Sequence, residues 1–203
     1  MNIDNFESKK FIETAEERER ILSDLRDSSK SKKFIETARS IVEKDATEMF
    51  SLEDIDRVSH ELGLDGVIYL EKFDDRRHVT VLLDLNRDNV NLYDPLSGVK
   101  VKPYDEIQFG MYCHPVGAFK DEFQAYEQQQ GLDKSGDIWT KYRKRGRLLI
   151  DFLNRHERFI SIYADSVLTG SNLPVLQDNR SSPDCAPISL FIMSVYNSVY
   201  SKT

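Results

Sequence analysis

Cys185 is the residue of this chain best placed to act as a nucleophile. Apolar residues follow it at i, i+3, i+4 and i+7, the spacing of one helix face: Ile188, Phe191, Ile192, Val195, Tyr196 and Val199. Leu190 and Met193 lie off this stripe, so we expect a helix that is enclosed on most sides. The dipole and the unpaired N–H groups at the start of such a helix favour the reactive thiolate. An inert core cysteine is the alternative, because unpaired cysteines are among the most buried residues.

A cysteine nucleophile needs a base, a group that orients the base, and donors for the oxyanion. His78 begins a predicted strand, and Asp94 ends the strand that returns beside it. Neighbouring antiparallel strands bring two such side chains together when the register puts them on one face. Direct alignment would centre the turn on Asn86, with Asp84 opposite Asp88. A bulge in the hairpin is the other way to obtain this alignment.

The other histidines are weaker candidates for a site. His60 lies in a predicted helix, His114 follows Cys113 directly, and His156 lies in a charged segment at a predicted helix end. The sequence contains no CxxC, HxxxH or HExxH spacing. We therefore expect neither a metal site nor a cofactor.

The remaining elements predict an α+β fold, in which an antiparallel hairpin lies beside a central helix. A helix is expected from residue 52 to 62, after an N-cap at Ser51 and before Gly63. The other predicted helices cover residues 121–130 and a basic segment through 147–153. Strands are predicted at 67–70, 78–85, 90–94, 99–102 and 159–164.

The N-terminal 50 residues contain an internal repeat. Residues 8–15 (SKKFIETA) recur at 31–38, an offset of 23 residues. Because 23 residues are not a whole number of helical turns, two helices broken around residues 23–29 are predicted. We interpret residues 1–50 as a helical appendage that is a candidate for binding substrate or a partner, and 51–203 as the main domain.

Composition narrows the function classes. The net charge of −7 argues against general nucleic-acid binding, which needs a basic face. Two cysteines cannot form a disulfide framework and suggest a reducing compartment. The first residues show no secretory signal pattern, and no apolar run approaches the ~20 residues that span a bilayer. A cytoplasmic protein is expected.

The order His78, Asp94, Gln177, Cys185 resembles that of the clan CE cysteine peptidases. This family includes the SUMO and ubiquitin-like-protein proteases, the adenovirus proteinase and bacterial effector deubiquitinases. The matching segments are residues 78–83, 92–96, 177–179 and 184–186, within a region of roughly 66–199. The resemblance implies that residues 51–203 form a peptidase domain with a papain-like, SUMO-protease-like core. Its central sheet would be mostly antiparallel, and a buried helix would start at the catalytic cysteine.

The resemblance also implies a role for each residue. Cys185 would be the nucleophile, His78 its base, and Asp94 the group that fixes the imidazole tautomer. Gln177 would donate to the oxyanion, together with the backbone N–H of Cys185.

The chain departs from the family pattern at three points. Val79 stands where a tryptophan often follows the histidine, and Ala186 stands where a glycine follows the cysteine. The interval from Gln177 to Cys185 is about two residues longer than in the SUMO proteases. These differences leave the catalytic set in place but argue against specificity for SUMO.

The leading expectation is a thiol isopeptidase that removes ubiquitin or a ubiquitin-like modifier such as SUMO or NEDD8. Deubiquitination by a bacterial effector secreted into the host cytosol is the favoured form. An acidic run of Glu71, Asp74 and Asp75 could meet the basic tail of ubiquitin, although a solvated loop explains it equally well.

Two alternatives stay open. The first is a Yop-type acetyltransferase that uses the same His/Asp/Cys set. Such relatives carry a large region after the cysteine, where this sequence has 18 residues, which favours the peptidase. The second is a catalytically silent partner-binding module, against which the complete catalytic set argues.

Overall fold

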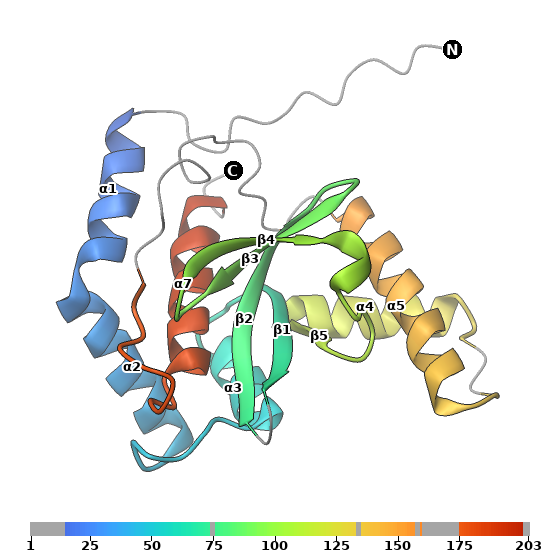
Figure 1. Cartoon of the computed structure of the whole chain (residues 1–203), viewed down its shortest axis with the longest axis horizontal. Helices are drawn as coiled ribbons and strands as arrows, with labels where there is room; N and C mark the ends of the chain where they lie inside the picture. Colours follow the sequence, from blue (N-terminus) through green and yellow to red (C-terminus); the bar gives the residue numbers. More distant parts are fainter. Residues whose placement is uncertain (1–14, 74–75, 133–134, 157–158, 160–174, 201–203) are drawn as a thin grey trace.

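The computed structural model describes residues 15–73, 76–132, 135–156, 159 and 175–200 (Figure 1). It is an α+β fold, as predicted. The helices are α1 (Ala15–Arg26), α2 (Ser28–Val42), α3 (Leu52–Glu61), α4 (Ala118–Gln129), α5 (Ile138–Arg155) and α7 (Cys185–Tyr200), and a 3₁₀ turn covers Tyr104–Glu106. The strands are β1 (Gly66–Phe73), β2 (Arg76–Leu85), β3 (Asn89–Asp94), β4 (Gly98–Pro103) and β5 (Cys113–Val116).

The strands form one antiparallel sheet in the order β4-β3-β2-β1-β5. The first four strands were predicted and follow one another as hairpins. Edge strand β5 was not predicted, because it is only four residues long and contains Pro115. Proline fits an edge strand, where one side of the backbone needs no partner. The strand predicted at 159–164 lies outside the described residues except for Phe159.

Helices cover both faces of the sheet, and a hydrophobic core lies on each side. One core joins α1, α2, α3 and α7 to one set of alternating strand residues, including Ile68, Val79 and Val81. The other joins α4 and α5 to the opposite set, including Val67 and Leu82. In Figure 1, α7 lies between the sheet and the N-terminal helices, while α4 and α5 lie on the other side. Of the site residues predicted from the sequence, Cys185 is part of the core on the α7 side.

Helix α7 starts at Cys185 and is enclosed, as its sequence predicts. Residues on and off its apolar stripe are buried: Ile188, Leu190, Phe191, Ile192, Met193 and Tyr196. The hydroxyl of Ser189 donates to the carbonyl of Val79 on β2. This contact ties the second turn of α7 to the strand that carries His78, so helix and strand are held at a fixed distance.

The two helices predicted in the N-terminal region are present, with a break at Asp27. The Asp27 carboxylate accepts hydrogen bonds from the backbone N–H groups of Ser29 and Lys30 and so caps α2. The second copy of the repeat lies in α2, while the first lies outside the described residues except for Ala15. Leu25, Ala38 and Val42 share their core cluster with α7. The division of the chain at residue 50 therefore stays a prediction, but α1 and α2 share one core with the helix that begins at Cys185.

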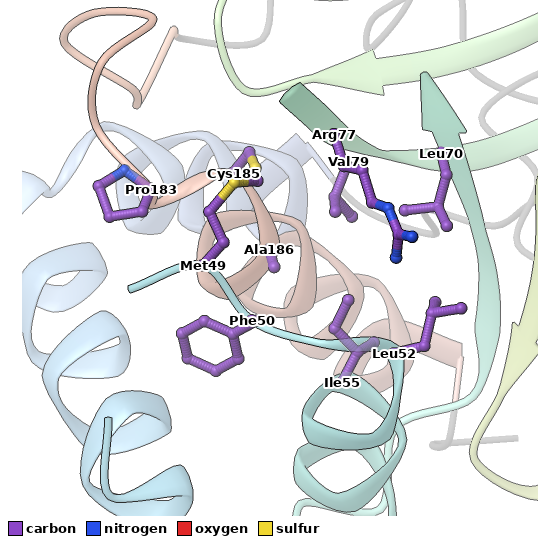
Figure 2. A pocket seen from close by; sticks show the side chains of 10 residues that line it. All are labelled: Met49, Phe50, Leu52, Ile55, Leu70, Arg77, Val79, Pro183, Cys185 and Ala186. Atoms are coloured by element: carbon purple, nitrogen blue, oxygen red, sulfur yellow. The ribbon is translucent and has the colours of Figure 1, made fainter. Parts of the chain in front are cut away.

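Helix α3 has the predicted cap. The Ser51 side chain accepts from the backbone N–H of Asp54, and the Asp54 carboxylate accepts from the backbone N–H of Ser51. Two N–H groups at the helix start are thus satisfied reciprocally. The cap fixes where the chain enters α3, and the residues just before it, Met49 and Phe50, line a small pocket that Cys185 also lines (Figure 2).

Candidate active site

A bulge sets the register of the hairpin that carries His78 and Asp94. Val81 pairs with Tyr93 and Leu82 with Leu92, but the register shifts between Leu82 and Asp84. This is the bulge that the sequence allowed, in place of direct alignment.

Continuing the ladder from Val81 and Tyr93 by one residue puts Thr80 opposite Asp94. His78 is two residues further along β2, on the same face, and is therefore a diagonal neighbour of Asp94. Diagonal pairs lie within reach of long side chains. The hairpin register thus brings the two predicted residues together.

Asp94 holds His78 directly. The Nε2–H group of His78 donates to Asp94 Oδ1 at 2.7 Å, and both residues are buried. On the other side of Asp94, the paired residue of β4 is Gly98. Lys100 is two residues beyond Gly98 and is therefore also a diagonal neighbour of Asp94. The Lys100 ammonium binds Asp94 Oδ2. The carboxylate therefore lies between a histidine on β2 and a lysine on β4.

The turn after β3 supplies two more hydrogen-bond donors to the Asp94 carboxylate. The backbone N–H of Leu96 donates to Asp94 Oδ1 and the Ser97 hydroxyl donates to Oδ2, both at 2.8 Å. Burial alone would raise the pKa of Asp94, but the hydrogen bonds from His78, Lys100, Leu96 and Ser97 outweigh it. They hold the pKa of Asp94 well below its ordinary value, so this carboxylate stays ionised.

The environment of His78 favours the charged imidazole. Burial acts to lower its pKa, but the hydrogen bond to Asp94, a hydrogen bond with Cys185 and the charges of both partners outweigh burial and raise the pKa to about 9. At neutral pH His78 is therefore mainly an imidazolium. An imidazolium beside a cysteine is the arrangement that stabilises a thiolate.

Cys185 reaches His78 from the other side of the site. The cysteine is the first residue of α7, and its thiol is a hydrogen-bond partner of His78. Because Nε2 of His78 is used by Asp94, the second ring nitrogen, Nδ1, is the one left for the thiol. The structure thus brings Cys185, His78 and Asp94 into one chain of contacts.

The loop before Cys185 is fastened to the turn after β3. The backbone N–H groups of Leu176 and Gln177 both donate to the carbonyl of Pro95, at 3.2 and 3.1 Å. Pro95 directly follows Asp94. The loop therefore carries Gln177 to the same cleft as the other three predicted residues, and all four line it.

The side chain of Gln177 is engaged within its own loop. Its amide nitrogen donates to the carbonyls of Ser182 at 2.7 Å and Asn179 at 3.2 Å. Its Oε1 atom is buried and has no hydrogen-bond partner among the described residues. In this arrangement Gln177 braces the loop in front of Cys185, and the oxyanion role stays a prediction.

The four predicted residues line a cleft of about 890 Å³. The β2 and β3–β4 residues form one wall, the loop from Gln177 to Pro183 forms another, and Thr47 and Met49 complete the rim. Only 3% of Cys185 is exposed, so a reactant reaches its sulfur through the cleft.

A smaller, apolar pocket lies on the other side of Cys185 (Figure 2). Its volume is only about 10 Å³, room for one small group at most. Figure 2 shows Cys185 and Ala186 facing Val79 and Arg77 of β2, with Met49 beside the cysteine. The thiol thus stands at a boundary between a polar cleft and an apolar wall.

Arg39 of α2 joins the N-terminal helices to the site. Its guanidinium forms an ion pair with Asp184, and the Ser182 hydroxyl also donates to that carboxylate. The carbonyl of Asp184 accepts from the backbone N–H of Ile188 in the first turn of α7. The residue before the cysteine is therefore held by α2, by its own loop and by α7.

The other histidines lie away from this site. His60 is exposed on α3, and His156 contacts Glu122 and packs edge-on against Phe119 and at a tilt against Phe152. Burial lowers the pKa of His114. Within the described residues, no group of three or more histidine, cysteine or acidic residues could hold a metal ion.

Three residues beside the candidate site were given no role there from the sequence. Lys100, Arg39 and Asp184 contact the site through ion pairs. A signal for Lys100 was present, because a hairpin turn that puts Asp94 opposite Gly98 also puts Lys100 on its diagonal. No local pattern indicated the contact between Arg39 and Asp184.

Comparisons with family models, with curated proteins and with solved structures find no match to this chain. Among the described residues, no helix is both long and apolar enough to cross a membrane.

Proposed function

We propose that this protein is a cysteine hydrolase that cleaves an amide or isopeptide bond through an acyl-enzyme at Cys185. The observation that carries the proposal is the 2.7 Å hydrogen bond between His78 and the ionised Asp94, with the same imidazole bonded to Cys185 at the start of α7. Cysteine, histidine and carboxylate in this order of contact are the parts of a thiol nucleophile.

In the proposed reaction, the Cys185 thiolate attacks the scissile carbonyl carbon and forms a tetrahedral oxyanion. The His78 imidazolium then gives its proton to the leaving amine, and the C–N bond breaks to leave a thioester on Cys185. Water, deprotonated by the now neutral His78, attacks the thioester, and the C–S bond breaks to release the acid and restore the Cys185 thiolate beside the His78 imidazolium. The backbone N–H of Cys185, at a helix N-terminus, is placed to donate to the oxyanion.

The proposed substrate is a conjugate of ubiquitin or a ubiquitin-like modifier, and the proposed setting is a bacterial effector with a papain-like, SUMO-protease-like core. Two observations support this proposal: the order His78, Asp94, Gln177, Cys185 in the sequence, and the position of all four residues in the lining of one cleft. The cleft also leaves room for an extended tail to lie against Cys185.

The test is incubation with ubiquitin, SUMO and NEDD8 that carry a C-terminal electrophile. We expect a covalent adduct with one probe, which is lost in Cys185→Ala and strongly slowed in His78→Ala. Cys113→Ala is the matched control, because Cys113 is buried on the other face of the sheet and should not affect labelling. If folded wild-type protein forms no adduct with any probe, the isopeptidase proposal fails. Turnover of acetyl-coenzyme A would then favour acyl transfer.

A further inference from the structure

The cleft at Cys185 is basic, although the chain as a whole carries a net charge of −7. Besides His78, its charged lining residues are four cations and one carboxylate: Arg76, Arg77, Lys100, Arg180 and Asp94. Lys100 and Asp94 form an ion pair with each other. The three arginines therefore decide the sign of the field in the cleft.

These arginines approach the thiol from two sides. Arg76 and Arg77 begin β2, directly before His78, while Arg180 lies in the loop before Cys185. All three are exposed, and none forms an ion pair with another described residue. Arg77 also lines the small pocket, where Figure 2 shows its side chain extending towards Leu70. Exposed guanidinium groups around a concave surface are available to carboxylates of a ligand.

The acidic run of Glu71, Asp74 and Asp75 does not offer all three carboxylates to the basic tail of ubiquitin. Glu71 is buried on β1 and forms an ion pair with Lys102 of β4. Asp74 and Asp75 lie outside the described residues. The charge of the described cleft is thus opposite to the charge that a basic tail requires.

We propose that this cleft binds an acidic segment of a protein substrate next to the scissile bond, with Arg76, Arg77 and Arg180 as specificity residues. This inference rests on the proposed hydrolase function and narrows it. A cleft with charge of one sign concentrates ligands of the opposite sign and repels those of its own. Modifiers with acidic residues near the scissile glycine are therefore favoured over ubiquitin, whose tail is basic.

The first experiment measures the field at the thiol without any peptidase substrate. Full-length protein is alkylated with iodoacetate, which is anionic, and with iodoacetamide, which is neutral, and modification of Cys185 is followed by peptide mass spectrometry. The full chain includes Asp74 and Asp75. The cleft variant, Arg76→Gln/Arg77→Gln/Arg180→Gln, should lower the iodoacetate rate relative to the iodoacetamide rate about fivefold. High salt should reduce this difference between wild type and variant.

The matched control removes three exposed cations from α5, in Lys141→Gln/Arg143→Gln/Arg147→Gln. Both triple variants change the net charge equally, so only a local effect separates them. An unchanged ratio in the cleft variant, or an equal fall in both variants, overturns the inference.

The second experiment compares fluorogenic peptides that end in Gly-Gly and carry glutamate, glutamine or lysine before it. We expect kcat/KM to be highest for the glutamate peptide, about tenfold above the lysine peptide, and the preference to vanish in the cleft variant. Equal or better cleavage of the lysine peptide overturns the inference.

A third experiment measures how far a ligand protects Cys185 from alkylation. It distinguishes an acidic peptide from phosphate as the ligand, and failure of the hydrolase proposal from failure of the charge selectivity. The glutamate peptide should slow alkylation of Cys185 by iodoacetamide, while inorganic phosphate at the same concentration should not. Protection by phosphate alone would overturn the acidic segment in favour of a phosphate ligand. If no peptide is cleaved but the glutamate peptide protects and the alkylation ratio falls as expected, the hydrolase proposal fails while the charge selectivity of the cleft stands.

Discussion

Arg39 on α2 forms an ion pair with Asp184, the residue directly before Cys185, across 145 positions of sequence. Both side chains are partly or largely shielded from water, with exposed fractions of 12% and 28%. Asp184 also accepts from the Ser182 hydroxyl. The N-terminal helices thus contribute to the position of the thiol as well as to the core.

Replacement of Arg39 should therefore weaken both the fold and the site. Arg39→Gln leaves Asp184 without its cation, and we expect a loss of about 1–2 kcal/mol in the free energy of unfolding. Alkylation of Cys185 should slow as well, because the loop that presents it loses an anchor. Urea unfolding and alkylation rates measure the two effects. Lys30→Gln is the control: Lys30 lies on α2 like Arg39, its ion pair with Asp24 of α1 is exposed, and its loss should change little. Wild-type stability in Arg39→Gln would contradict this account.

Lys100 should affect the pKa of His78 through their shared partner, Asp94. In Lys100→Met, the carboxylate loses one of the hydrogen bonds that lower its pKa, and no lysine charge offsets its negative charge beside His78. The pKa of His78 should then rise further above 9, and the pKa of Asp94 should move back towards its ordinary value. NMR titration of the His78 ring measures the change. Lys102→Met is the control, because Lys102 lies on the same strand but pairs with Glu71. A lower pKa of His78 in Lys100→Met would refute the proposed coupling.

The raised pKa of His78 makes stability depend on alkaline pH. The pKa rises from 6.5 in the unfolded chain to about 9 in the folded protein, so the folded state binds this proton more tightly. The resulting stabilisation is complete below pH 6.5 and is lost between pH 6.5 and 9. A shift of this size corresponds to about 3 kcal/mol.

Urea unfolding from pH 6 to 10 tests this dependence, with His78→Gln and Cys185→Ala as comparisons. His78→Gln should remove most of the decline. Cys185→Ala should reduce it, because the bond to Cys185 helps to raise the pKa of His78. An equally steep decline in His78→Gln would assign the effect to other groups.

A substitution at Gln177 distinguishes two roles for its side chain: holding the loop before Cys185, and donating to the oxyanion. Its amide bonds to the carbonyls of Ser182 and Asn179 imply that Gln177→Leu lowers the free energy of unfolding by about 1–2 kcal/mol. A pure oxyanion donor would instead leave stability unchanged and lower kcat about 10²- to 10³-fold. Thermal unfolding and single-turnover kinetics of Gln177→Leu separate the two. Gln124→Leu, an exposed change on α4, is the control for the substitution itself.

Local sequence patterns were enough to predict most elements of the fold. The apolar spacing after Cys185 predicted an enclosed helix, and the Ser51–Asp54 cap predicted the start of α3. Both patterns are local, because the cap lies within one helical turn and the apolar spacing recurs along one continuous segment of sequence. Strand β5 was missed because four residues with a proline carry too short a pattern, and its pairing with β1 alone defines it.

The candidate site was predictable as a set of residue types but not as a geometry. The sequence by itself determined that a cysteine at a helix start, a histidine and an acid were present in an order known from thiol peptidases. Only the tertiary structure decided that the bulge between Leu82 and Asp84 puts His78 diagonal to Asp94, and that the Gln177 loop docks on Pro95. The same is true of the pair between Arg39 and Asp184. The physical reason is that register and loop docking depend on contacts between residues far apart in the chain, and such contacts leave no local periodicity to read.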